Sequence, residues 1–379
     1  MKEIHFQTQA LKSVENQLEA VAPISTPLYL STTFARNPDG TYPDGFIYTR
    51  HDNPNRRILE QSLAQLEKGA VAYAFSSGMA AIHTVFQTLK PGDHVLLPDD
   101  VYYNIYLLME AVFKDWGLEV SLVDCADLDA VAQAIQTNTK LIWLETPSNP
   151  QLKITDIAGV VALAQTHNIL VAVDNTWASP VLQQPLDLGA DIVMHSTTKY
   201  FGGHSDVLGG ALILKTNNEL ADKIRNIQTL SGAVPSPFDC WLIARGIQTL
   251  YLRVQAQSET ALALAQFLAA HPQIECVNYP GLASHPKHEV ARSQMRNGFG
   301  GMLSILVKGD AKRAMQIASC LEYFAMATSL GGVESLVEHR KSVEGENSTT
   351  PANLLRLSIG LEHIEDLKKD WEQALSLSE

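Results

Sequence analysis

Short apolar runs alternate with amphipathic stretches through the first two thirds of this chain, and this alternation constrains the fold more than any other feature. Apolar runs of about four to eight residues, separated by stretches long enough for a helix, are typical of parallel strands that are buried on both faces. The candidate strands are residues 72–75, 94–97, 120–123, 141–144, 170–173, 192–194 and 211–214, with helices such as 79–89 and 157–167 between most of them. We therefore expect an α/β protein with a mostly parallel, seven-stranded sheet, helices on both faces and a ligand site at the carboxyl ends of the strands.

The pattern divides the chain into three parts. Residues 1–55 contain several prolines and threonines together with Gly40 and Gly45, and they are predicted to form an extended N-terminal arm. Residues 56–237 carry the alternating pattern, which begins with a helix that Gly69 is expected to end as a C-cap residue. Residues 238–379 are predicted to form a smaller C-terminal α/β domain.

Within the C-terminal part, one long helical pattern runs from 238 through 270. The other expected elements are strands at 302–307 and 354–359 and helices at 311–321 and 367–375. The polar stretch 338–353 is predicted to be a loop near or over the site, because binding residues are often carried on loops.

Charge and composition restrict the class of partner. A formal net charge of −13 without any basic run argues against nucleic acid or an anionic membrane, so a small-molecule substrate is expected. No apolar run approaches the roughly 20 residues of a membrane helix, and the first residues lack the order of a signal peptide. The four cysteines are not at metal or redox spacing, so we predict no metal site and reduced thiols in a cytoplasmic protein.

Lys199 stands in the segment Ser-Thr-Thr-Lys-Tyr-Phe-Gly-Gly-His-Ser-Asp, 25 residues after Asp174 ends an apolar run. A lysine among hydroxyls and glycines, downstream of such an acid, is typical of the residue that binds pyridoxal phosphate covalently. This cofactor needs a lysine for its aldehyde, an anion for its pyridinium nitrogen, an aromatic cover for its ring and donors for its phosphate. Lys199 and Asp174 are the candidates for the first two tasks.

Candidates for the other two tasks lie at the ends of other predicted strands. The stretch Phe-Ser-Ser-Gly-Met-Ala leaves a strand and opens a helix, so its N–H groups can hold an anion with the help of the helix dipole. The candidate phosphate ligands are Ser77, Gly78, Met79, Ser196 and Thr198, and Tyr102 is the candidate ring cover. Each residue alone has an ordinary explanation, as a helix cap or a surface lysine, but their common place at sheet ends favours a cofactor site.

These residues give the chain a resemblance to a known family. The most specific piece is HSTTKYFGGHSDVLGG at 195–210, and the likeness runs from PLYLSTTF at 27–34 to LRLSIGLE at 355–362. The chain resembles the Cys/Met-metabolism family of pyridoxal phosphate enzymes, which are trans-sulfuration enzymes related to cystathionine γ-synthase, cystathionine γ-lyase, cystathionine β-lyase and methionine γ-lyase. The resemblance implies a type I (aspartate aminotransferase-like) fold, an amino-acid substrate and a homotetramer made of two dimers with shared active sites.

The resemblance also implies roles for individual residues. Tyr48 and Arg50 resemble the pair that reaches across a subunit boundary to the neighbour's cofactor phosphate, a task that suits the planar fork of arginine. The implied catalytic residues are Lys199 and Tyr102, Thr176 is a further cofactor contact, and the implied substrate ligands are Asn149, Ser329 and Arg356. Arg356 matches the clamp for the substrate α-carboxylate, and its place in an apolar run supports this role, because a buried arginine needs an anion.

Some positions depart from the family pattern. Ile47 and Thr328 stand where family members that act on cystathionine by γ-chemistry tend to carry acids, which removes two partners for the distal ammonium of cystathionine. Many bacterial cystathionine β-lyases have a tryptophan at the position of Trp177, where other family members have phenylalanine. Tyr103 and Asn104 stand where family members commonly have a glycine pair after the tyrosine that covers the ring. We expect γ-synthase-like chemistry on activated homoserine or sulfur amino acids. The alternatives are a cystathionine β-lyase, a methionine γ-lyase or homoserine-ester sulfhydrylase, and a catalytically silent homologue that binds the cofactor.

Overall fold

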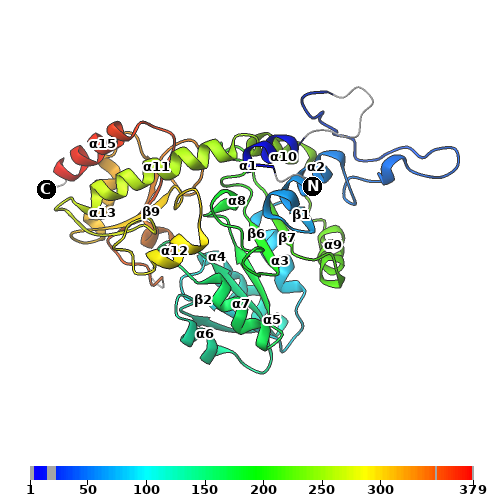
Figure 1. Ribbon diagram of the computed structural model, residues 1–379, viewed down its shortest axis with the longest axis horizontal. Helices are drawn as coiled ribbons and strands as arrows, with labels where there is room; N and C mark the ends of the chain where they lie inside the picture. Colours follow the sequence, from blue (N-terminus) through cyan, green and yellow to red (C-terminus); the bar gives the residue numbers. More distant parts are fainter. Residues whose placement is uncertain (1–3, 15–22, 346–347, 378–379) are drawn as a thin grey trace.

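The computed structural model describes residues 4–14, 23–345 and 348–377. The described chain contains one seven-stranded sheet and one five-stranded sheet, each covered by helices. The long helix α11 (Leu250–Ala269) runs from the elements of the large sheet to those of the small one (Figure 1). None of the helices in these ranges is both long enough and apolar enough to cross a membrane.

The large sheet has the strand order β1-β7-β6-β5-β4-β2-β3. Its strands are β1 (Val71–Phe75), β2 (His94–Pro98), β3 (Glu119–Val123), β4 (Thr139–Glu145), β5 (Leu170–Asp174), β6 (Ile192–His195) and β7 (Gly210–Leu214). Only β7 runs antiparallel to its neighbours, and the other pairs are parallel. All seven observed strands overlap the predicted ones, so the predicted fold class is confirmed.

Alternate residues of these strands point to opposite faces, and both faces are buried. In β5, Val171 and Val173 belong to one hydrophobic cluster and Ala172 to another on the opposite face. The helices on the Ala172 face are α3 (Gly78–Gln87), α4 (Tyr103–Leu108), η2 (Met109–Phe113) and α9 (Glu219–Ser231). The helices on the other face are α2 (Pro54–Glu67), α6 (Leu128–Ala134), α7 (Ile157–Thr166), α8 (Ser179–Leu182) and α10 (Pro237–Ile247).

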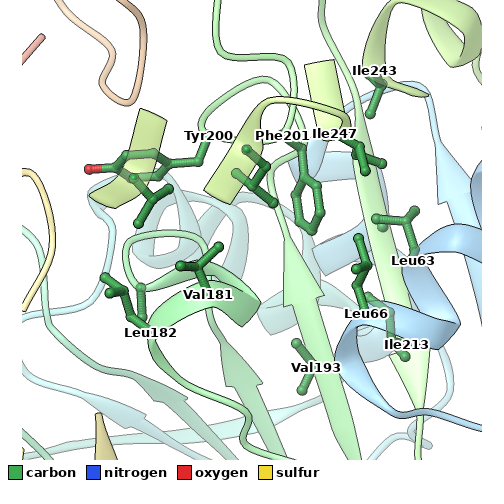
Figure 2. Close-up of a cluster of buried hydrophobic side chains, with 14 of the residues drawn as sticks. Leu63, Leu66, Val181, Leu182, Val193, Tyr200, Phe201, Ile213, Ile243 and Ile247 are labelled. Carbon is green, nitrogen blue, oxygen red and sulfur yellow. The ribbon is translucent and has the colours of Figure 1, made fainter. Parts of the chain in front are cut away.

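A hydrophobic cluster beneath α2, α8 and α10 holds the segment that carries Lys199 (Figure 2). The two residues after this lysine, Tyr200 and Phe201, are almost completely buried in that cluster. The ring of Phe201 also meets His195, at the end of β6, edge-on with centroids 4.8 Å apart. The loop after β6 is therefore fixed by its own aromatic side chains.

The small sheet has the strand order β10-β11-β12-β9-β8 and is mostly antiparallel. Its strands are β8 (Ile274–Asn278), β9 (Met302–Val307), β10 (Ala325–Met326), β11 (Leu336–Glu338) and β12 (Leu354–Ser358). Helices α13 (Ala311–Cys320) and α15 (Ile364–Leu377) pack against it together with the end of α11. The remaining short elements are α1 (Phe6–Lys12), η1 (Pro43–Gly45), α5 (Lys114–Trp116), α12 (His288–Gln294) and α14 (Arg340–Glu344).

The structure corrects several predicted elements. The long helix expected over 238–270 is two helices, because the helical run stops at Gln248 and resumes at Leu250. The arm is not extended throughout, since α1 packs on α2 and buries Ala10. Lys68, and not Gly69, takes the left-handed conformation that ends α2.

Gly69 has a different reason to be glycine. A Cβ there would lie 2.3 Å from the side chain of Ile213 on β7, so the missing side chain allows α2 and the sheet to approach closely. The polar stretch 338–353 is also not all loop, because it contains α14; residues 346–347 of that stretch lie outside the described ranges.

Candidate active site

A cavity of about 400 Å³ lies at the carboxyl ends of the large-sheet strands, where residues of the small sheet close it. This volume is within the usual range for small-molecule sites. The predicted site residues that line it are Ser77, Gly78, Met79, Tyr102, Asn149, Asp174, Thr176, Ser196, Thr198, Lys199, Ser329 and Arg356. Segments from most of the chain length therefore meet in one place, as a sheet of this topology requires.

Lys199 projects into this cavity from the fixed loop after β6. Its Nζ donates a hydrogen bond to Ser329 Oγ at 2.8 Å. Burial, together with the nearby positive charge of Arg356, lowers the pKa of Lys199 to about 8. A substantial fraction of the amine is therefore neutral near neutral pH, as a nucleophile or general base requires.

Ser329 occupies a strained position, because it is a non-glycine residue with a φ of 99°. Ser329 contacts both Lys199 and Arg356: its hydroxyl accepts from Lys199 Nζ, and its carbonyl oxygen accepts from Arg356 Nη2 at 3.2 Å. The strained residue thereby links the lysine to the arginine.

Asp174 ends β5 beside Glu145, its partner in register on β4. Both carboxyls are buried, and Thr176 donates its backbone N–H to Asp174 Oδ1 at 3.0 Å. Burial and the neighbouring charge of Asp174 raise the pKa of Glu145 well above its ordinary value. Burial raises the pKa of Asp174 as well, although hydrogen bonds from Thr176 and the charge of Lys199 oppose that shift. Two buried carboxyls this close favour one shared proton, and Glu145, whose pKa is raised further, is the better holder, which leaves Asp174 as the anion.

The start of α3 forms a cup that fits a phosphate. The Ser77 side chain caps the helix by accepting from Ala80 N at 3.0 Å, while the N–H groups of Gly78 and Met79 have no carbonyl partner within the helix. A Cβ on Gly78 would lie 3.1 Å from Ser196 Oγ, so a side chain there would crowd the cup that glycine leaves open.

The hydroxyl of Thr198, which the sequence predicts as a phosphate ligand, already has hydrogen-bond partners within the chain. Its hydroxyl exchanges hydrogen bonds with the backbone of Gly209, accepting from the N–H at 3.0 Å and donating to the carbonyl at 3.2 Å. The hydroxyl of Thr176 similarly accepts from Ser196 N at 2.9 Å. Both threonines therefore stabilise the cup as well as line the cavity.

Tyr102 stands at the start of α4 with its ring in the cavity wall. Its backbone N–H donates to Glu145 Oε2 at 2.9 Å, and its hydroxyl accepts from Asn104 Nδ2 at 2.7 Å. Burial raises the pKa of this phenol, although the charge of Arg340 opposes the shift. The tyrosine is therefore a neutral aromatic surface that is tied to the β4 carboxyl.

Arg356 is buried in β12, but its anionic partner lies within the chain. Its Nη2 lies 2.5 Å from Glu338 Oε2, and its Nη1 donates to Asn149 Oδ1 at 3.0 Å. Burial in an apolar run therefore does not argue for a substrate carboxylate, and that step of the sequence reasoning was wrong. The side chain still lines the cavity beside Asn149 and Ser329.

The structure does not bring Tyr48 and Arg50 to this cavity. They lie in the arm over residues 23–53, part of which extends away from the rest of the chain in Figure 1, and neither lines the cavity. Tyr48 is 43% exposed, and Arg50 Nη1 donates to the backbone carbonyl of Thr229 at 3.0 Å. Both side chains stand at the surface of this subunit.

Sequence reasoning missed four charged residues of the site. Glu145, Arg340 and Glu344 line the cavity, and Glu338 lies directly behind Arg356. Glu145 ends its strand in the same manner as Asp174, so the rule that singled out Asp174 could have found it. Arg340 and Glu344 carried no signal beyond their place in a polar stretch that was expected near the site.

Comparisons with known proteins identify the family of the chain. The family model described as Cys/Met metabolism PLP-dependent enzyme matches residues 7–376. The cystathionine gamma-synthase of Mycobacterium tuberculosis is 49% identical over 374 residues, covering 97% of this chain and 96% of the relative. The cystathionine beta-lyase of Coxiella burnetii is 41% identical over 383 residues, covering 99% of this chain and 98% of the relative.

Two solved structures are similar over almost the whole chain. The crystal structure of metB from Corynebacterium glutamicum superposes with a TM-score of 0.96 at 44% identity and covers 99% of both chains. The cystathionine gamma synthase of Xanthomonas oryzae pv. oryzae, solved in complex with cystathionine, gives a TM-score of 0.95 at 38% identity and covers 100% of this chain and 99% of that one. Sequence, fold and site geometry thus lead to one conclusion: the chain belongs to the Cys/Met metabolism family of PLP-dependent enzymes, with their type I fold.

Proposed function

We propose that this protein is a cystathionine γ-synthase, which binds pyridoxal phosphate in the cavity and replaces the γ-substituent of an activated homoserine with the sulfur of cysteine. The observation that carries the proposal is the Lys199 amine, with its lowered pKa, held by Ser329 between a phosphate cup and the Arg356 guanidinium. Relatives with this name at 49% identity, and a structure of one in complex with cystathionine, support the choice of reaction.

The large sheet supplies the residues for the cofactor. When bound, pyridoxal phosphate supplies an electron-withdrawing ring that stabilises negative charge on the substrate's α-carbon. Asp174 would keep the ring nitrogen protonated, and Tyr102 would cover the ring. The phosphate ligands in the proposal are Ser77, Gly78, Met79, Thr176, Ser196 and Thr198.

The residues for the substrate come from both parts of the chain, with Arg356 on β12 of the small sheet and Asn149 and Lys199 in loops that follow strands of the large sheet. Arg356, aligned by Asn149 and Ser329, would bind the α-carboxylate of the amino acid with its planar fork. Lys199 Nζ would take the proton from the α-carbon, because its lowered pKa leaves neutral amine available near neutral pH. The hydroxyl of Ser329 would hold Nζ in place through their 2.8 Å hydrogen bond.

The proposal includes a homotetramer of two dimers in which each arm completes the neighbour's site. Among the described residues that line the cavity, the arginines and lysines are Lys199, Arg340 and Arg356, and both arginines already pair with Glu338. A phosphate dianion favours a positive partner, which Arg50 of a second subunit would supply together with the Tyr48 hydroxyl.

Subunit mixing tests the shared site. Lys199→Ala and Arg50→Gln subunits, each nearly inactive alone, should recover about a quarter of wild-type activity when refolded together, because half of the random dimers contain one intact site. Mixtures that recover no activity would show that each arm serves its own subunit.

The proposal also covers the domains and the location of the protein. It divides the chain into an arm (1–55), a large cofactor domain (56–237) and a small domain (238–379). It places the protein in the cytoplasm.

Product analysis tests the reaction itself. Purified protein would be incubated with O-succinyl-homoserine plus cysteine, with cystathionine, and with methionine, and the products identified by mass spectrometry. New cystathionine from the first mixture, absent with Lys199→Ala, is the expected result. 2-Oxobutyrate from cystathionine or methionine without any synthesis would identify an eliminating lyase and overturn the proposal.

Cystathionine β-lyase activity is the second candidate. Trp177 lines the cavity and is only 6% exposed, and it is the residue that resembles β-lyases. The Coxiella burnetii relative carries this name. Pyruvate together with homocysteine from cystathionine would select this reaction.

A further inference from the structure

Two arginines on different helices fix the N-terminal arm where its backbone turns, at residues 49–51. Arg56, on α2, donates from Nη1 to the carbonyl oxygen of Thr49 at 2.8 Å and from Nη2 to the next carbonyl at 3.5 Å. Arg225, on α9, donates from Nη2 to the carbonyl oxygen of His51 at 2.8 Å. Consecutive carbonyls of the arm are therefore held from both faces of the large sheet.

Glu60 joins the two arginines. Its Oε1 lies 3.7 Å from Arg56 Nε, and its Oε2 accepts from Arg225 Nη1 at 3.3 Å. Oε1 also accepts from the backbone N–H of Ala74 at 2.9 Å, which ties the group to the edge strand β1. Burial raises the pKa of Glu60, and the charges of Arg225 and Arg56 oppose this shift. Arg56, Glu60 and Arg225 therefore form one unit, the arm clamp.

The arm is also fixed nearer its start. The side chain of Asn55, which is 2% exposed, donates to the carbonyl oxygen of Pro27 at 2.8 Å and accepts from the N–H of Tyr29 at 2.8 Å. Thr33 then pairs with Tyr48 in an antiparallel bridge. The part of the arm that leads to Tyr48 and the part that follows it are both hydrogen-bonded to buried side chains of α2.

The clamp binds the backbone and leaves the two neighbouring side chains at the surface. The guanidinium carbon of Arg50 lies 5.9 Å from the centroid of the Tyr48 ring, so the two side chains stand together. The hydrogen bond from Arg50 to the carbonyl oxygen of Thr229 uses one of its five N–H groups, so this guanidinium can still bind an anion.

The clamp is better suited to fix a position than to stabilise the fold. Water can satisfy the carbonyls of a surface turn, whereas charges that lose their hydration regain little net stability by pairing. The side chains of Arg56 and Glu60 are nevertheless only 1% and 11% exposed. What these buried charges determine is where residues 48 and 50 stand.

We propose that the arm clamp is a set of positioning residues, which hold Tyr48 and Arg50 in the conformation that meets the cofactor phosphate of a neighbouring subunit. This inference rests on the proposed function, because it deepens the shared site. Loss of the clamp in one subunit should therefore impair the cavity of another subunit and leave its own cavity intact.

Equilibrium dialysis of apoprotein against pyridoxal phosphate tests the clamp without any reaction. Arg225→Gln removes the charge and the reach to His51, and it should weaken cofactor affinity by about 5- to 50-fold with an unchanged circular dichroism spectrum. Arg292→Gln, which replaces an exposed arginine on α12, is the matched control and should bind like the wild type.

A double-mutant cycle separates positioning from a general effect on the fold. In a Tyr48→Phe/Arg50→Gln background the arm no longer offers its phosphate contacts, so Arg225→Gln should change the affinity by less than about twofold. A loss as large as in the wild-type background would show that the clamp supports the fold and would overturn the inference.

Subunit mixing shows which cavity the clamp serves. When Lys199→Ala and Arg50→Gln subunits are mixed, the intact site takes its arm from the Lys199→Ala subunit. Arg225→Gln added to that subunit should raise the cofactor concentration for half-maximal activity by about 5- to 50-fold. The same change added to the Arg50→Gln subunit should alter it by less than about twofold. The reverse pattern would show that the clamp supports the cavity of its own subunit, against the inference.

The dialysis also distinguishes failure of the inference from failure of the shared site. Wild-type affinity in Arg225→Gln beside weakened affinity in Arg50→Gln would overturn the inference and leave the shared site standing. Wild-type affinity in Arg50→Gln as well would refute the shared site, and the inference would fall with it. Neither result depends on which reaction the enzyme catalyses.

Discussion

Replacement of Arg356 by glutamine should slow the capture of pyridoxal phosphate by Lys199. Burial and the charge of Arg356 lower the pKa of Lys199, whereas the charge of Glu338 raises it. The variant loses the cation that lowers this pKa and keeps the carboxylate that raises it, so the pKa of the amine should move toward its ordinary value. Only the neutral amine attacks the cofactor aldehyde.

The magnitude follows from the fraction of neutral amine. With a pKa of about 8 about one tenth of the lysine is neutral at pH 7, whereas an ordinary value of 10.5 leaves about one part in three thousand. Loss of the whole shift would therefore slow capture about 300-fold at neutral pH. Burial remains in the variant, so the expected effect of Arg356→Gln is about tenfold, or about one pKa unit.

Stopped-flow mixing of apoprotein with pyridoxal phosphate, from about pH 6 to about pH 10, measures this effect. The wild-type rate should rise about tenfold per pH unit and level off near pH 8, because the lowered pKa means that the proton has left above that pH. The variant should level off at a higher pH, and Arg292→Gln should match the wild type. A wild-type rate that rises without a bend to pH 10, or an unmoved bend in the variant, would refute the reasoning.

Three further predictions follow from buried contacts. Gly78→Ala places a Cβ 3.0 Å from the Ser196 side chain, so cofactor affinity in equilibrium dialysis should fall by about 5- to 150-fold. The circular dichroism spectrum should stay unchanged. Full cofactor affinity would show that the phosphate binds elsewhere. Phe201→Ala should cost about 3–5 kcal/mol in the free energy of unfolding by urea, and a loss under about 1 kcal/mol would mean that this ring does not anchor the loop. Burial and the charge of Asp174 raise the pKa of Glu145 in the folded state, so the wild type loses stability as the pH rises above about 4.5 toward that raised pKa. Glu145→Gln lacks this titration and should gain stability relative to the wild type over the same range. Parallel pH profiles of the two proteins in urea unfolding would contradict the shift.

The large sheet could be predicted because its strands are buried on both faces. Runs such as 170–174 are continuously apolar up to the functional residue that ends them, so both strand and site follow from one pattern. The sequence did not indicate β8, β10 and β11 of the small sheet, because β8 and β10 are partly or fully exposed and the buried β11 is only three residues long. In β8, for example, Glu275 and Cys276 face solvent, and the apolar pattern is too weak to indicate a strand.

The candidate site was predictable where a residue stands at the end of a strand or the start of a helix. Asp174 and Gly78 meet this condition, Lys199 follows in the loop after β6, and the structure brings the three together. The partners of Arg356 could not be predicted in this way, because Glu338 becomes its neighbour only through the antiparallel pairing of β11 with β12. The sequence showed that a buried arginine needs an anion, but not that the chain itself supplies one.

The two halves of the site belong to different sheets, and this separation couples geometry to reactivity. Arg356, on the small sheet, lowers the pKa of Lys199, on the loop of the large sheet. Any motion that parts the sheets would widen the entrance and, in the same movement, move the pKa of the amine toward its ordinary value, which lowers the neutral fraction. An open molecule would therefore react more slowly with aldehydes at neutral pH than a closed one.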